Sequence, residues 1–336
     1  MVDGEHYPEV VRDALRDLPY EFVAVLLVGG TDKLRGEPDY GVPVVGELPD
    51  VDAVVDLTDE RRPELVAAAL AGGMPYIGSD FRFDPPPLHP FEVPSISVIG
   101  TGKRVGKTAV TTHLARMLAR DRKVVCVAMG RGGPAEPELV TEPPTIDDFV
   151  ARSRAGQHAA SDFLELAALA GVPTVGCRRA GGGVSGAPFV SNVLEGAKLA
   201  ATLDPDIVIF DGSGSAIPPI ASETRICVGR EPFRAAISDV VLDEVELRLT
   251  PTEETEGRVA VFTAGPANVD HLDDVVFVSH DLARRDVLRE QLARLDADTY
   301  LIELKAAAID VVAEYALQHG KRVVLARNDV LVEVPV

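Results

Sequence analysis

A glycine- and lysine-rich segment lies near residue 100, between a mostly apolar stretch and a predicted helix. It reads Gly100-Thr-Gly-Lys-Arg-Val-Gly-Lys-Thr108. A strand that runs into such a loop and then into a helix is typical of phosphate binding, because loop N–H groups and the helix N-terminus both attract anions. Thr101 stands where the usual pattern has glycine, so the loop is one residue longer than usual. We predict that it binds a nucleoside triphosphate.

The expected roles within this loop follow from phosphate chemistry. Lys107 should reach the β- and γ-phosphates, and the Thr108 hydroxyl should hold Mg²⁺. Asp211 ends an apolar strand, where a P-loop fold places the carboxylate that orients this ion. A glycine-rich turn that merely contains lysine is the alternative, but the strand before the loop and the apolar face of the helix after it favour nucleotide binding. The predicted nucleotide-binding residues are Gly100, Thr101, Gly102, Lys103, Arg104, Val105, Gly106, Lys107 and Thr108.

Positive charge gathers in glycine-rich loops, although the chain has a net charge of -20. Arg131 and Gly132 follow a second predicted strand, and Arg178 and Arg179 follow a third. Glycine lets the backbone approach an anion, and arginine offers a planar two-pronged donor for phosphate. Each arginine alone could be a solvated loop charge, but together they favour a small phosphorylated substrate beside the nucleotide. The predicted catalytic residues are Lys103, Lys107, Arg131 and Asp211, with Thr108 and Asp211 as metal ligands.

Bulk composition excludes several classes of protein. The strong negative charge argues against nucleic acid or an anionic membrane as a partner. No apolar run reaches the roughly 18 residues of a membrane-spanning helix, and the amino terminus is charged, so we expect a soluble cytoplasmic protein. Aromatic residues are 5% and tryptophan is absent, while 46% of residues are hydrophobic, which is typical of parallel sheets flanked by helices. The cysteines, Cys126, Cys177 and Cys227, lack metal-ligand spacing and should be reduced and buried.

The pattern along the chain predicts an α/β protein with two parts. Residues 1–90 should form a smaller Rossmann-like α/β domain, and residues 91–336 a P-loop nucleotide-binding catalytic domain with a mostly parallel sheet. The proline-rich segment 84–90 should be an extended linker that cannot pair with a strand. The loops at 29–33 and 56–60 follow strands, where open α/β sheets bind ligands.

The predicted elements alternate between the two types through most of the chain. The predicted strands are 22–28, 42–45, 51–56, 123–129, 173–177, 206–211, 224–228, 259–263, 275–279, 300–304 and 323–326. The predicted helices are 9–17, 63–71, 107–120, 189–202, 282–295 and 305–319, with further helical material at 146–170. Residues 251–257, rich in Thr and Glu, should be a surface loop.

The loop from Gly100 to Thr108 resembles that of dethiobiotin synthetase in length and in its Gly-Thr…Val-Gly-Lys-Thr frame. The chain as a whole is similar to the cyclic 2,3-diphosphoglycerate synthetase family, which belongs to the same P-loop class. Both halves of the chain carry the similarity. The matching stretches are Asp3-Gly-Glu-His-Tyr-Pro8, Gly29-Gly-Thr-Asp-Lys-Leu34, Met129-Gly-Arg-Gly-Gly-Pro134 with Glu136 and Glu138, and Glu303-Leu-Lys-Ala-Ala-Ala308.

This resemblance implies ATP-dependent closure of a ring between the two phosphates of 2,3-diphosphoglycerate, with release of ADP and phosphate. It also implies a homodimer, and substrate contacts from Glu5, His6 and Lys305, beside the Mg²⁺ expected from the P-loop pattern. The substrate residues are then Glu5, His6, Arg131, Gly132, Arg178, Arg179 and Lys305. Two other readings stay open: a dethiobiotin-synthetase-like ligase that activates another acid, and a non-catalytic nucleotide switch of the partitioning type.

Overall fold

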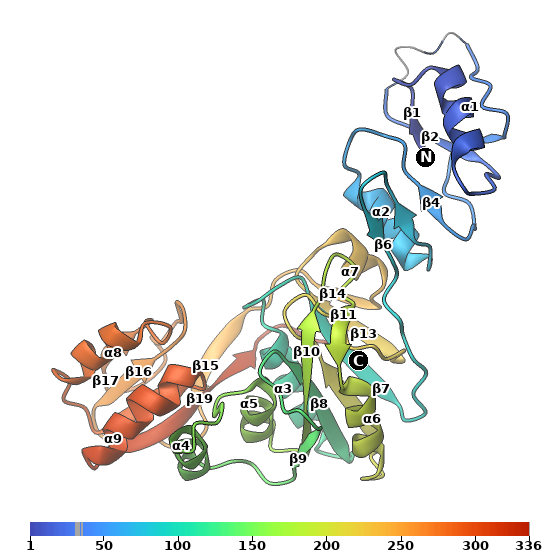
Figure 1. Ribbon diagram of the computed structural model, residues 1–336. Coiled ribbons are helices and arrows are strands. Elements are labelled where there is room, and N and C mark those ends of the chain that lie inside the picture. The colour runs from blue at the N-terminus through green and yellow to red at the C-terminus, as the bar shows by residue number, and fades with distance from the viewer. Residues whose placement is uncertain (31–33, 35, 336) are drawn as a thin grey trace. The chain divides into compact units, whose positions relative to one another are not determined.

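The computed structural model describes residues 1–30, 34 and 36–335, and it divides into two compact units (Figure 1). The first comprises Met1–Pro86 and Glu231–Ile237, and the second comprises Pro87–Arg230 and Ser238–Val336. Among the described residues, no helix has the length and apolar character needed to cross a bilayer.

The described residues of the first unit form short strands and three helices. Strands β1 to β3 form one parallel sheet, whereas β4 pairs in parallel with β5, and β5 pairs in the antiparallel direction with β6. Two small apolar clusters support these sheets, one around Val11 and Tyr40 and one around Ala69 and Tyr76. The elements are β1 (Val2–Asp3), α1 (Pro8–Asp17), β2 (Val25–Val28), β3 (Val44–Val45), β4 (Val54–Val55), α2 (Pro63–Ala71), β5 (Tyr76–Ile77), β6 (Arg82–Phe83) and α7 (Pro232–Ala236).

The second unit contains an eight-stranded sheet whose path runs β11-β10-β8-β12-β7-β13-β14, with β9 paired to β10. All neighbouring strands are parallel except at β11 and β9. Its strands are β7 (Ser95–Gly100), β8 (Val124–Gly130), β9 (Glu138–Val140), β10 (Thr174–Gly181), β11 (Pro188–Ser191), β12 (Ile207–Asp211), β13 (Thr224–Val228) and β14 (Val240–Leu242). Its helices are α3 (Lys107–Leu118), α4 (Ile146–Arg154), α5 (Asp162–Ala170) and α6 (Val193–Ala201).

A second, five-stranded sheet follows in the order β15-β19-β18-β16-β17. Strands β17, β16, β18 and β19 are parallel, and β15 runs against β19. The expected α/β class with mostly parallel sheets is confirmed. The elements are β15 (Leu247–Pro251), β16 (Val259–Phe262), β17 (Val275–Ser279), α8 (Arg285–Leu292), β18 (Thr299–Glu303), the π-helix η1 (Ala308–Ala313), α9 (Glu314–Gln318) and β19 (Arg322–Val330).

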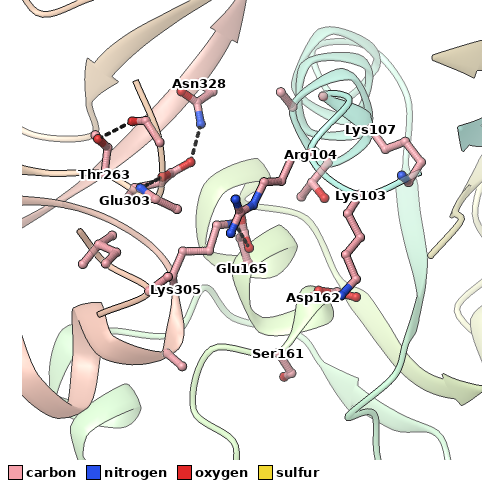
Figure 2. A pocket seen from close by; sticks show the side chains of 18 of the residues that line it. Lys103, Arg104, Lys107, Ser161, Asp162, Glu165, Thr263, Glu303, Lys305 and Asn328 are labelled. Carbon is pink, nitrogen blue, oxygen red and sulfur yellow. Dashed lines mark hydrogen bonds and ion pairs between the residues drawn. The ribbon is translucent and has the colours of Figure 1, made fainter. Parts of the chain in front are cut away.

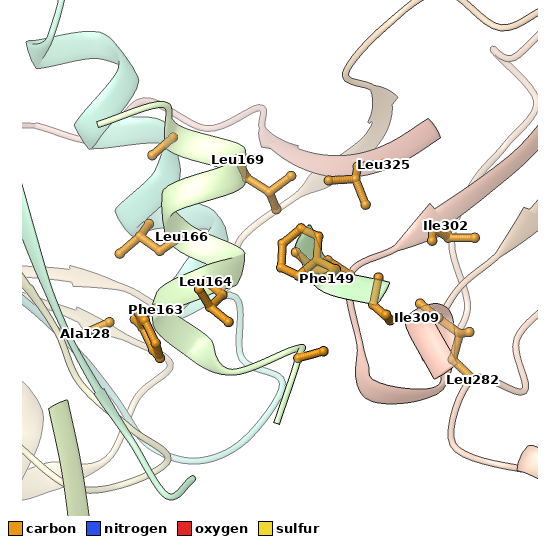
Figure 3. Packing of buried hydrophobic residues seen from close by; sticks show 14 of the residues in the cluster. Ala128, Phe149, Phe163, Leu164, Leu166, Leu169, Leu282, Ile302, Ile309 and Leu325 are labelled. Atoms are coloured by element: carbon orange, nitrogen blue, oxygen red, sulfur yellow. The ribbon is translucent and has the colours of Figure 1, made fainter. Parts of the chain in front are cut away.

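One apolar core joins the two sheets of the second unit. Phe149 of α4 and Leu169 of α5 belong to the same buried cluster as Ile302, Ile309 and Leu325 of the five-stranded sheet and its helix (Figure 3). Because close-packed interiors resist deformation, this shared core fixes the loops of one sheet against those of the other.

Two sequence predictions of local structure were wrong. Residues 189–191 are not helical but belong to strand β11, an edge strand on which Phe189 is 97% exposed. The helical material predicted at 146–170 consists of two helices, α4 and α5, with Ser161 as the N-cap of the second. The segment 84–90 does pair, because His89 forms a parallel bridge with Ile220 through two backbone hydrogen bonds of 3.0 and 2.8 Å. Proline removes a backbone N–H donor only at its own position. His89, between Leu88 and Pro90, therefore keeps its N–H.

Candidate functional site

A cavity of about 950 Å³ lies in the second unit, between the phosphate loop and the loops of the five-stranded sheet. Its walls come from the loops after β7 and β16, from the ends of β8, β12 and β18, and from the start of α5. In an open parallel sheet the carboxyl ends of the strands meet at one edge, which explains why distant segments converge here. Figure 2 shows side chains from both sheets directed into this space.

The phosphate loop enters the cavity through Lys103, Arg104, Gly106, Lys107 and Thr108. Gly106 precedes helix α3 with a φ of 99°, a conformation that glycine adopts without strain. Lys107 is buried, and its ammonium group donates a hydrogen bond to the carbonyl of Gly102. Burial lowers the pKa of Lys107, while Asp211 acts in the opposite direction. The lysine therefore lies in a cavity where an added phosphate would compensate its lost hydration.

Asp211 lies beside the phosphate loop because β12 is paired between β7 and β8, with Asp211 opposite Val98 on one side and Ala128 on the other. Its Oδ1 accepts a 2.9 Å hydrogen bond from the Thr111 hydroxyl of α3. Burial, with a further contribution from Asp162, raises the pKa of Asp211 to about 7. Such a carboxylate is poised to bind a cation, because a cation would restore its ionised form.

Two arginines converge on Gly214, in the loop after Asp211. A β-carbon added to Gly214 would lie 2.4 Å from a terminal nitrogen of Arg131 and 3.1 Å from one of Arg179. Arg179 donates to the carbonyl of Ser213 at 2.7 Å, and Arg131 makes no hydrogen bond or ion pair with the described residues. Burial and the neighbouring Arg131 lower the pKa of Arg179. Asp162 acts in the opposite direction, but no ion pair in the described part of the chain joins a carboxylate to either arginine, so an anion between them would stabilise their like charges.

An ion pair crosses from the eight-stranded sheet to the five-stranded one. The ammonium group of Lys305 lies 3.0 Å from both carboxylate oxygens of Glu165, a buried residue of α5. Burial alone would lower the pKa of Lys305, but Glu165 and Glu303 raise it, so the lysine is charged. Glu303 in turn accepts the Ala264 N–H at 2.6 Å and the Asn328 amide at 3.0 Å.

The cavity thus brings together most of the predicted residues, though not all of them. Arg131, Gly132, Asp211 and Lys305 line it with the phosphate loop. Arg179 reaches its wall through Ser213, whereas the Arg178 side chain is exposed and does not line it. Their roles remain predictions.

Other predicted residues belong to the first unit. Glu5 donates its backbone N–H to Asp3 at 3.1 Å, and a ring nitrogen of His6 lies 2.6 Å from the same carboxylate. In the predicted loop 29–33, residues 31–33 lie outside the described residues.

Sequence reasoning missed Asp162, Glu165 and Glu303 as cavity residues. Figure 2 shows Lys103 directed toward Asp162. The one available signal was the start of α5, where Ser161-Asp-Phe-Leu-Glu165 matches a helix beginning with acidic residues in its first turn. That pattern predicts a helix end and gives no hint that the acids face a cavity.

The residues present are compatible with Mg²⁺. Among the described residues, no group of three or more His, Cys, Asp or Glu side chains could hold a metal. Mg²⁺ commonly takes only one or two protein ligands and completes its shell with phosphate oxygens and water. Thr108 and Asp211 line the same cavity, and Thr111 is hydrogen-bonded to only one Asp211 oxygen.

Comparison with known proteins identifies the family. Models of the P-loop, C-terminal and N-terminal domains of cyclic 2,3-diphosphoglycerate synthetase match residues 95–240, 251–329 and 1–49. A Rubrobacter xylanophilus protein of that name is 42% identical over 99% of this chain and 94% of its own. The chain belongs to the cyclic 2,3-diphosphoglycerate synthetase family.

Archaeal members of the cyclic 2,3-diphosphoglycerate synthetase family are also similar to this chain. The Thermococcus kodakarensis protein is 36% identical over 98% of this chain and 93% of its own, and the Pyrococcus horikoshii protein 35% over 96% and 90%. The Rubrobacter alignment spans 415 positions, more than the 336 residues here, so that relative carries internal segments that this chain lacks. A solved structure of LpxK from Aquifex aeolicus matches 73% of this chain and 86% of its own, with a TM-score of 0.44 and 17% identity.

Proposed function

We propose that this protein is an ATP-dependent synthetase that converts 2,3-diphosphoglycerate into its cyclic form and releases ADP and phosphate. The proposal rests mainly on one cavity, which is lined by the phosphate loop and by Arg131, while Arg179 converges with Arg131 on Gly214 at the cavity wall. The names of the relatives across the full chain support the same activity.

The reaction requires several anionic groups to meet, and the cavity offers donors for them. In this proposal, the backbone of Gly102 to Thr108 and the ammonium of Lys107 hold the ATP phosphates. Arg131 and Arg179 hold the acceptor phosphate of the substrate, beside Gly132. Phosphoryl transfer depends mainly on positioning and charge stabilisation, so these donors supply most of what the protein must contribute.

The proposed chemistry has two steps. An oxygen of one substrate phosphate attacks the γ-phosphorus of ATP, the bond to the β-phosphate oxygen breaks, and ADP leaves. An oxygen of the other substrate phosphate then attacks the phosphorus of the first substrate phosphate. The bond from this phosphorus to the oxygen that carries the former γ-phosphoryl group breaks, and that group leaves as inorganic phosphate. Both reacting phosphates belong to one bound molecule, so ring closure gains effective molarity and needs no nucleophilic side chain.

Four further features belong to the proposal. Mg²⁺, held by Thr108 and Asp211, would supply positive charge to the ATP phosphates. Glu5 and His6 are kept as substrate residues on the family resemblance, and Arg178 on its place in a glycine-rich loop after a strand. A homodimer rests on the same resemblance, and a cytoplasmic location on composition.

Phosphorus NMR of the protein with ATP, Mg²⁺ and 2,3-diphosphoglycerate tests this function. We expect ADP, phosphate and a new phosphoanhydride signal from the wild type. Lys107→Ala should reduce turnover by about 10³-fold or more, because Lys107 would stabilise charge on the transferring group. Lys198→Ala, which removes an exposed lysine of α6 outside the cavity, is the matched control.

Other outcomes would favour the rival activities. ADP release with another acid but not with 2,3-diphosphoglycerate would indicate a different acid-activating ligase. Nucleotide-dependent association without turnover would indicate a switch. Full activity of a folded Lys107→Ala variant would contradict the phosphate-loop assignment itself.

A further inference from the structure

The five-stranded sheet lines one side of the cavity at a point where its strand connections reverse; this side, between β16 and β18, is called the crevice. From β16 the chain passes to β17 on one side, and then to β18 on the other side of β16, so the order of connection reverses between β16 and β18. In open parallel sheets, ligands bind outside the carboxyl ends of the strands at such a reversal. The loops leaving these two strands, Thr263–Asn268 and Glu303–Ala307, both line the cavity.

The walls of this crevice are held in place by hydrogen bonds. Both carboxylate oxygens of Glu303 are occupied, one by the Ala264 N–H at 2.6 Å and one by the Asn328 amide at 3.0 Å. The Thr263 hydroxyl donates to the carbonyl of Gly265 at 2.7 Å. These contacts fix the β16 loop to β18 and β19, so the crevice is preformed and Glu303 is not left as an open metal ligand.

Two cations face the crevice with donors to spare. Lys305 engages Glu165 through two 3.0 Å contacts, but an ammonium group has three donors, and 39% of its side chain is exposed. Arg104 comes from the phosphate loop, and Figure 2 shows its side chain directed toward Glu165 and Lys305. It makes no hydrogen bond or ion pair with the described residues.

The backbone of Arg104 adds a second, independent observation. Its φ is 62°, in the left-handed region that side chains other than Asn, Asp and Gly seldom adopt. A strained residue of this kind persists where the surrounding structure requires it, often at a ligand site. Arg104 combines this backbone conformation with a guanidinium directed across the cavity, toward the C-terminal sheet.

We propose that the crevice between β16 and β18 is a second anion subsite, which binds the phosphate of the substrate that attacks in ring closure. Lys305 and Arg104 donate to this phosphate, and Glu165 positions Lys305. The inference rests on the proposed function. It gives the two substrate phosphates separate cationic ends of one cavity: Arg131 with Arg179 at Gly214, and Arg104 with Lys305 at the C-terminal sheet. Separate cations are expected, because the two vicinal phosphates repel each other and each needs donors of its own before they can approach for ring closure.

Ligands that carry one or both phosphates distinguish the two subsites. Calorimetry should measure binding of 2,3-diphosphoglycerate, 2-phosphoglycerate and 3-phosphoglycerate to the wild type, Arg131→Ala, Arg104→Gly and Lys305→Met. We expect Arg104→Gly and Lys305→Met each to weaken the diphosphate and the same single monophosphate by at least tenfold. Arg131→Ala should weaken the diphosphate and the other monophosphate. Equal weakening of both monophosphates by Arg104→Gly, or no weakening, overturns the inference.

Folding and functional failure are controlled separately. Glycine relieves the left-handed backbone at position 104, so Arg104→Gly removes the guanidinium without a folding penalty. If Lys305→Met is unstable because Glu165 is left unpaired, the double variant Glu165→Gln with Lys305→Met replaces it. Arg120→Ala, an exposed arginine outside the cavity, should bind all three ligands as the wild type does.

Failure of the proposed function gives a different result from failure of the subsite. If the wild type binds none of the three glycerates, the proposed function fails. Calorimetry of inorganic phosphate binding, with ADP present, then tests the crevice directly. Phosphate binding that Arg104→Gly weakens at least tenfold supports an anion subsite. Unchanged or absent phosphate binding overturns it.

Discussion

At the scale of single residues, Asp211 links stability to function with a definite sign. Its pKa in the folded protein is raised to about 7, against an ordinary value near 4. Between those pH values the folded protein binds more protons than the unfolded chain, so stability falls as pH rises. We predict that Asp211→Asn stabilises the ligand-free protein at pH 8 by up to about 4 kcal/mol, and that the gain disappears toward pH 4. Urea unfolding at several pH values measures this.

The same substitution should remove activity, since the amide cannot neutralise a cation. Asp121→Asn is the control, because Asp121 is exposed at the end of α3 and should change neither stability nor turnover. A loss of stability at pH 8 in Asp211→Asn would mean that Asp211 has a structural role.

The role of a residue could be predicted only where a short sequence motif indicates it. The Gly-Lys-Thr pattern and a strand ending in aspartate are short motifs, and they placed Lys107 and Asp211 in one cavity. Glu165 and Lys305 are 140 residues apart, and their pairing depends on how two sheets pack. The left-handed backbone of Arg104 leaves no signature in residue type. Such features become visible only with tertiary structure.

At the scale of elements, the loop after β8 depends on a close backbone approach. A β-carbon at Gly133 would lie 2.0 Å from the carbonyl oxygen of Cys177, and a backbone atom cannot move aside as a flexible side chain would. We predict that Gly133→Ala displaces the loop that carries Arg131, costs about 1–3 kcal/mol of stability, and raises the substrate KM more than the ATP KM. Thermal unfolding and steady-state kinetics measure these effects.

Gly46→Ala is the matched control, because an added β-carbon at Gly46 meets nothing within 4 Å. Its stability and both KM values should stay close to those of the wild type. An unaltered substrate KM in Gly133→Ala would separate the Arg131 loop from substrate binding.

The predictable elements were those with a strong apolar pattern. Helix α2 and strands β13 and β17 have the predicted bounds, because each is a short apolar run between clear turn signals. Strands β9, β14 and β15 were not predicted. They have three to five residues, at most one of which is buried, so their pattern is weak. Strand β11 was taken for helix because edge strands of mixed polarity lack a clear alternation.

At the scale of the whole molecule, the second unit arranges its site between two sheets that share one core. The sequence predicted four of the five strands of the C-terminal sheet, β16 to β19, but neither β15 nor that these strands form a sheet separate from the P-loop sheet. Strand order depends on contacts between residues far apart in the chain, which residue periodicity does not encode. The cavity therefore depends on how the sheets pack. The phosphate-binding motifs that line it, by contrast, could be recognised in single loops.

The net charge of the whole molecule predicts how its thermal stability depends on salt concentration. With 53 acidic and 33 basic residues, like charges repel across the surface of the folded protein. Raising the salt concentration from about 0.05 to 0.5 M shortens the screening length from about 14 to 4 Å and weakens this repulsion. Exposed ion pairs weaken too, but each contributes only about 0–1 kcal/mol. We therefore predict that the ligand-free protein gains several degrees in Tm, equally in KCl and NaCl, because screening does not depend on which monovalent cation is present. A falling Tm would mean that the ion pairs outweigh the net charge, and a gain in only one salt would indicate a bound cation.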